Sequence, residues 1–168
     1  MPNWVKTRVI AMKTTVNFEK FTDEDGNFSL EKIVPMPKDI YRGSLGDKER
    51  AQYGEKNWYD WSIQHWGTKW DCNNSYISGN IVEFETAWTF PVFAMIALAK
   101  KVGTLFCLYA DEDIGSNNCG GVVIFKNGKT VEVDPCTLFA QSLWNDGLPM
   151  KASDVDASFG WIIRENSE

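Results

Sequence analysis

The segment Asn57 to Asp71 (NWYDWSIQHWGTKWD) constrains the fold more than any other part of the chain, because it holds four of the eight tryptophans. Tryptophan buries a large apolar surface and carries one N–H group that needs a hydrogen-bond partner. Four indole rings this close together require either the centre of a core or an adhesive surface. Trp58, Trp61 and His65 fall at helical spacing on one face, and Gly67 is expected to end that helix.

Two predicted strands and one predicted helix follow. Residues 81–88 (IVEFETAW) alternate, with Trp88 on the face of Phe84. Residues 104–110 (TLFCLYA) are almost continuously apolar, which is typical of a central strand covered on both faces. The helix expected over 90–102 has Thr89 as its N-cap, Pro91 in its first turn and two lysines in its last.

The remaining segments give weaker signals. Residues 4–16 are expected to form a strand, and Ser29 is expected to cap a short helical turn. Residues 41–54 are polar and glycine-punctuated, which predicts a loop containing one helical turn, and residues 69–80 predict a loop or a short edge strand. Asn127-Gly128 between two alternating runs is a strong hairpin signal, and a short helix is expected over 137–144.

This order of elements predicts an α+β fold, a ferredoxin-like antiparallel sheet with two main helices on one face. We expect a single domain over residues 1–168. Its ferredoxin-like core covers about 3–133, and a C-terminal hairpin/helix extension follows over 134–168. The sheet face opposite the helices has three open alternatives: exposure, coverage by the tail, or use in a dimer.

Charge limits the classes of partner. Lysine and arginine total 17 and aspartate and glutamate total 23, which gives a net charge of −6. Proteins that follow a nucleic-acid backbone need a basic footprint, so direct nucleic-acid binding is not expected. The acidic balance fits a partner with a basic protein surface better.

Compartment and cofactors are also constrained. The opening MPNWVKTRVI lacks the features of a secretion signal, and the longest apolar run, residues 90–99, is about half of the ~20 residues that a membrane span needs. We therefore expect a cytoplasmic protein with no membrane contact. The four cysteines lack metal-ligand spacing, so free thiols, no metal and no cofactor are expected.

Four sequence segments resemble one known family. They are MPNW at the start, IVPMP, HWGTKWD, and VEFETAW followed by a proline-started helix. Together they are similar to the YubB-type ferredoxin-like domain family of small phage and plasmid proteins, from Asn3 to about Val133, with WGTKWD (66–71) the most specific part. The resemblance implies a ferredoxin-like core and a mobile-element origin, but no iron–sulfur cluster and no catalytic residue. The chain departs from the family at His65, where asparagine is expected, and in the tail after Asp134.

The WGTKWD segment has two interpretations. As a binding surface, Trp66 and Trp70 would offer stacking faces, Lys69 a cation and Asp71 a carboxylate. As a structural corner, Gly67 would permit a tight turn, the tryptophans would fill the core, and the aspartate would accept backbone N–H groups.

Two further groups of residues are candidates. His65 and Cys72, with Asp71, have the composition of a thiol nucleophile and its base, if the fold brings them together. Two acidic loops, one with Asp111, Glu112 and Asp113 and one with Asp23 and Asp25, would suit lysine or arginine side chains of a partner. Neither loop has the ligand spacing of a calcium site.

The sequence therefore favours a non-enzymatic interaction protein of a phage or plasmid. We expect it to bind and block a host protein or nucleoprotein complex with a basic surface, such as a defence nuclease of the CRISPR type. The alternative is a nucleotide- or small-molecule-binding module that uses the aromatic WGTKWD region, and a third possibility is an enzyme built on His65 and Cys72.

Overall fold

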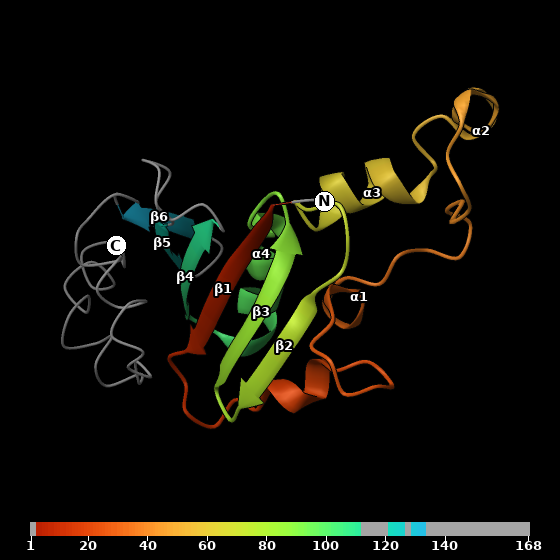
Figure 1. The fold of residues 1–168 in the computed structure, drawn as a ribbon. Coiled ribbons are helices and arrows are strands. Elements are labelled where there is room, and N and C mark those ends of the chain that lie inside the picture. Colours follow the sequence, from red (N-terminus) through yellow and green to blue (C-terminus); the bar gives the residue numbers. More distant parts are fainter. Residues whose placement is uncertain (1–2, 112–120, 127–128, 134–168) are drawn as a thin grey trace.

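The computed structural model describes residues 3–111, 121–126 and 129–133 (Figure 1). Strand and helix bounds in chain order are β1 (Trp4–Ala11), the 3-10 helix η1 (Phe18–Phe21), α1 (Leu30–Ile33), α2 (Asp47–Tyr53), α3 (Trp58–His65), β2 (Asn73–Ser78), β3 (Ile81–Ala87), α4 (Val92–Val102), β4 (Leu105–Asp111), β5 (Gly121–Lys126) and β6 (Lys129–Val133).

The strands form one antiparallel sheet in the order β2-β3-β1-β4-β5-β6. The first helical segments lie between β1 and β2 in sequence, and α4 lies between β3 and β4. The quartet β2-β3-β1-β4 with these two crossovers is the ferredoxin-like arrangement. The expected α+β fold is therefore confirmed, and β5 and β6 extend its sheet beyond β4.

The main core lies between the sheet and α4, which Figure 1 shows behind the strands. Val9 of β1 pairs with Val82 of β3 and with Cys107 of β4, and all three side chains are buried. Met95 and Leu98 of α4 are fully buried against the same cluster. Each such side chain contributes on the order of 1.5–3 kcal/mol by leaving water, so this layer holds the helix on the sheet.

The opposite face of the sheet differs between its two halves. On β1 and β3, Arg8 Nε donates to Glu83 Oε1 over 2.6 Å. Further along, Ile10, Phe106 and Ile124 are buried without belonging to the core cluster under α4. The central part of this face is thus buried. Use of the face in a dimer stays a prediction.

The edge strand β2 is irregular. Its pairing with β3 shifts register between Asn73 and Tyr76, and Asn74 has a φ of +46°. A bulge of this kind twists the outer strand and interrupts its row of hydrogen bonds. Of the two alternatives for residues 69–80, the structure selects the short edge strand.

Three boundaries differ from expectation. The first strand ends at Ala11 rather than continuing to residue 16. Within residues 41–54 the structure has the seven-residue helix α2 rather than one turn, held at its base by stacked rings of Tyr41 and Tyr53 with centroids 4.3 Å apart. The helix α4 begins at Val92 with Pro91 at the N-cap position, so Thr89 is not its cap.

The predicted hairpin is present as β5 and β6, which are paired down to Lys126 and Lys129. Its turn residues 127–128, the helix expected over 137–144 and the extension 134–168 lie outside the described residues. Among the helices that are described, none has the length and apolar character to cross a membrane.

Gly67 offers a test of the contact between α3 and α4. Its φ is +87°, and an added Cβ would lie 3.1 Å from the Val92 backbone nitrogen. Gly26 has a similar φ of +85° but open space around it. Both Gly→Ala substitutions should cost about 1 kcal/mol for the backbone conformation. Gly67→Ala should cost a further ~1–3 kcal/mol from overpacking, measured by urea unfolding. Equal losses for the two variants would contradict this close approach.

Candidate interaction surface at Trp70 and Trp88

The WGTKWD segment (66–71) leaves α3 and is anchored by buried polar contacts. Trp66 is 5% exposed, and its Nε1–H donates to the Val34 carbonyl over 2.9 Å. Thr68 is fully buried, and its hydroxyl donates to the Ala87 carbonyl at the end of β3 over 2.9 Å. Buried donors that find partners in this way fix the chain's path, so Trp66 belongs to the core and not to a binding face.

Two hydroxyls hold the backbone on either side of Thr68. The Thr89 hydroxyl donates to the Gly67 carbonyl over 2.7 Å, and the Ser62 hydroxyl of α3 lies 2.8 Å from the Lys69 carbonyl. Thr89, which the sequence suggested as a helix cap, therefore joins the β3–α4 connection to the WGTKWD segment. Residues 67–69 are held from three elements at once.

Asp71 performs the helix-capping role that the sequence assigned to Ser29. Its Oδ1 accepts the Leu30 N–H over 2.6 Å, and its Oδ2 accepts the Glu31 N–H over 3.3 Å. The Ser29 hydroxyl donates to Oδ2 over 2.7 Å, and the Cys72 N–H points at Oδ1 over 2.7 Å. These contacts support the structural interpretation of Asp71, because both carboxylate oxygens already accept hydrogen bonds within the protein.

The rest of the segment reaches the surface. Lys69 Nζ lies 4.3 Å from the Trp70 ring centroid, 4.6 Å from that of Trp88 and 5.8 Å from that of Tyr59. The ring centroids of Trp70 and Trp88 are 6.3 Å apart, and those of Trp4 and Trp70 are 6.4 Å apart. We call these five residues the Trp70–Trp88 cluster. It lies where β1 begins, β3 ends and α3 passes (Figure 1).

Trp88 is the member that the sequence placed wrongly. Alternation put it on the face of Phe84, but β3 ends at Ala87 and Trp88 has a φ of +66°. Trp88 is 49% exposed, and its backbone N–H donates to the Asn3 carbonyl over 2.9 Å. A bulky residue in the left-handed region costs on the order of 1–3 kcal/mol and marks candidate functional positions. No pattern of polar and apolar residues reveals such a backbone reversal.

The contacts of His65 and Cys72 in the described part of the chain are with other residues and not with each other. The His65 ring stacks on Trp61 at 4.4 Å, with its Nδ1 2.8 Å from the Trp61 carbonyl. Burial raises the pKa of the Cys72 thiol well above its usual range, and the Asp71 charge adds to this. Burial alone does the same to the pKa of Cys107. Thiols that resist ionisation are poor nucleophiles.

The acidic candidates are spread over two places. Asp23 Oδ1 accepts the N–H groups of Asp25 and Asn27 over 3.0 and 2.8 Å, so this carboxylate shapes a turn while Asp25 stays exposed. Asp111 is the last residue of β4, and Glu112 and Asp113 lie outside the described residues. Within the described ranges, no three His, Cys, Asp or Glu side chains gather as metal ligands do.

Comparison with known families gives one match. Residues 65–145, somewhat under half of the chain, match a family described as the ferredoxin-like domain in Api92-like protein. The match begins at the end of α3, includes the whole WGTKWD segment and continues through β2, β3, α4 and the following strands. The protein thus contains a ferredoxin-like domain, by this similarity as well as by its topology. Comparisons with curated proteins and with solved structures found no match.

Asp71→Ala tests the structural role of that carboxylate. We expect a loss of about 2–4 kcal/mol in the free energy of unfolding, because three N–H groups and a hydroxyl lose a charged acceptor. Asp25→Ala, which removes an exposed acid, should change it by less than about 0.5 kcal/mol. Urea titrations of both variants measure the difference. A similar small change in both would show that Asp71 is not the cap on which α1 depends.

Thiol reactivity tests the enzymatic alternative. The Cys119→Ser/Cys136→Ser variant leaves Cys72 and Cys107 as the two thiols. At neutral pH, iodoacetamide should modify these two at least about tenfold more slowly in the folded protein than in urea. The reason is that their raised pKa values keep the thiols protonated in the folded protein. Mass spectrometry of timed samples gives both rates. Rapid modification of Cys72 in the folded protein would contradict this and reopen a catalytic role.

Proposed function

We propose that this protein is a non-enzymatic interaction protein that binds a host protein through the Trp70–Trp88 cluster and blocks it by occupying its surface. The observation that carries the proposal is Trp88. A ring of this size, half exposed and held at a φ of +66°, lowers stability where glycine would be free of strain. A role of the exposed indole ring in binding would explain why tryptophan stands at this strained position.

The composition of the cluster supports a protein partner. Tryptophan and tyrosine are enriched among the few residues that dominate binding energy at protein interfaces. Here the rings are already ordered by Lys69, whose amino group lies over both exposed indoles. Side chains fixed before binding lose less entropy on association, so the cluster is preorganised for contact with an apolar or cationic surface.

The charge distribution suggests what the partner looks like. In the sheet register Trp4 pairs with Ala87 and Val5 pairs with Asp111, so Asp111 lies at the same end of the sheet as Trp88. With a net charge of −6, the protein would be attracted to a basic surface. The resemblance to phage and plasmid proteins then favours a host defence complex whose nucleic-acid channel is basic.

A second candidate function rests on the geometry of the rings. Trp70 and Trp88 lie within 29° of parallel, as in a platform on which a nucleotide base could stack. Lys69 covers both indole rings, however, so a base would have to displace its amino group or stack on faces that it leaves open. A panel of nucleotides should give no rise in melting temperature through this cluster, and a rise that Trp88→Gly abolishes would favour the second function.

Trp88→Gly separates binding from stability. Glycine relieves the backbone strain while the stacking with Trp70 is lost, so the free energy of unfolding should change by no more than about 1 kcal/mol. Capture of host proteins on the tagged wild-type chain should give one complex at fixed stoichiometry, and the variant should lose it. Added to the purified complex, the wild-type chain should inhibit it at a 1:1 ratio.

Tyr76→Ala is the matched control. Tyr76 is 65% exposed on β2, where it pairs with Glu83, five residues before Trp88. The substitution therefore removes an exposed ring that lies away from the Trp70–Trp88 cluster. It should retain the partner. Loss of the partner in both variants, or in neither, would refute the assigned surface. Recovery of no host complex by the wild-type chain would refute the proposed function itself.

A further inference from the structure

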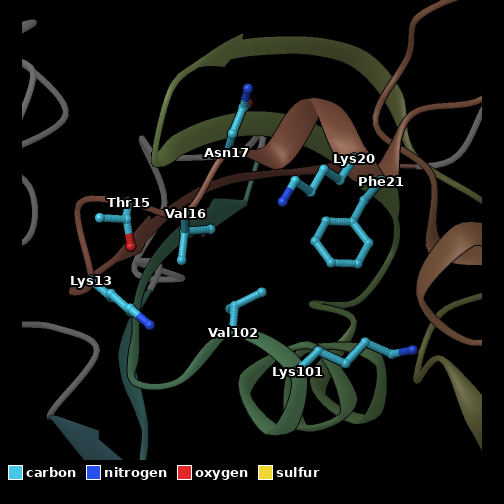
Figure 2. Close-up of a pocket in the computed structure, with 8 residues that line it drawn as sticks. All are labelled: Lys13, Thr15, Val16, Asn17, Lys20, Phe21, Lys101 and Val102. Atoms are coloured by element: carbon cyan, nitrogen blue, oxygen red, sulfur yellow. The ribbon is translucent and has the colours of Figure 1, made fainter.

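A pocket of about 350 Å³ lies between the β1–η1 connection and the end of α4 (Figure 2). Its lining combines three lysines with apolar and polar side chains: Lys13, Thr15, Val16, Asn17, Lys20, Phe21, Lys101 and Val102. The volume is within the range of small-molecule sites. The pocket is built from segments other than the Trp70–Trp88 cluster, and nothing argued above assigns it a role.

The lining is cationic in an acidic protein. No carboxylate lines the pocket, and in the described part of the chain none of the three lysines forms an ion pair. Figure 2 shows Lys13 and Lys20 extending their amino groups into the pocket from separate positions, whereas Lys101 extends away from its centre. Because no carboxylate is among the lining residues, the positive charge of these lysines would attract an anion to the pocket.

Compensation of the helix dipole accounts for only one of these lysines. Lys101 is in the last turn of α4, where a cation is favourable next to the carbonyl end of a helix. Lys13 and Lys20 come from the β1–η1 connection and from η1 instead. That both line one pocket, from different sides of it, is a separate feature of the fold (Figure 2).

The apolar wall indicates the rest of the ligand. Val16, Phe21 and Val102 are half-buried, and the Phe21 ring and Val102 face the pocket in Figure 2. A bare anion would make no use of them. A ligand with an anionic group and an apolar or aromatic body would pair with the lysines and cover the wall, and pockets of mixed character bind such molecules.

We propose that this pocket binds a small organic phosphate, with its phosphate between Lys13 and Lys20 and its ring against Phe21 and Val102. Charge-assisted contacts from two ammonium groups suit phosphate oxygens, which accept several hydrogen bonds at once. Thr15 lines the same pocket and carries a hydroxyl that can donate a further bond. The site is independent of the interaction surface proposed above.

The test uses the full chain and three probes: inorganic phosphate, a nucleoside, and the corresponding nucleoside monophosphate. Calorimetric titration should give binding of the monophosphate, at least about tenfold weaker binding of inorganic phosphate, and none of the nucleoside. The double variant Lys13→Ala/Lys20→Ala should weaken monophosphate binding at least about tenfold. All three lysine side chains of the pocket are exposed, so the melting temperature without ligand should not fall.

Lys100→Ala removes a neighbouring exposed lysine that does not line the pocket, and it should bind like the wild type. Trp88→Gly should also retain monophosphate binding. Absence of any binding at millimolar monophosphate, or unchanged binding by the double variant, would overturn the proposal. Equal affinity for inorganic phosphate and the monophosphate would overturn the role of the apolar wall.

Discussion

The rest of the structure depends on one carboxylate, that of Asp71. It joins the end of the WGTKWD segment to the first turn of α1, 40 to 42 positions earlier in the chain, through the N–H groups of Leu30 and Glu31 and the Ser29 hydroxyl. A four-residue helix has no stability of its own, so an external acceptor decides whether α1 forms. Asp71 also accepts the Cys72 N–H, directly before β2 begins at Asn73, so the carboxylate joins α1 to the start of the edge strand.

That anchoring divides the tryptophans into two sets. Trp61 and Trp66 are buried and meet edge to face at 5.4 Å, with the Trp66 N–H bonded to a backbone carbonyl. Trp70 and Trp88 are 38% and 49% exposed and share one lysine. The two interpretations of the aromatic segment thus hold for different residues. The buried pair is anchored through the Trp66 N–H, and it supports the exposed pair, which is free to make contacts.

The sequence predicted the fold well where periodicity decides the structure. The alternation of residues 81–87, the apolar run of β4 and the Asn-Gly hairpin each gave a strand in its correct place. It failed where a long-range contact decides. Thr89 caps no helix because the Gly67 carbonyl is its partner, and Trp88 faces outward because its backbone reverses after β3. The lysine pocket was missed because its residues come from distant segments with no shared pattern.

The bulge in β2 has a consequence for how this protein can meet others. An exposed outer strand ordinarily offers its backbone as a template on which a strand of another chain can add. Here the register shift between Asn73 and Tyr76, with the left-handed backbone of Asn74, breaks that template within a six-residue strand. Extension of the sheet from one copy to the next is disfavoured, which leaves recognition to side chains and keeps the molecule from growing into a filament.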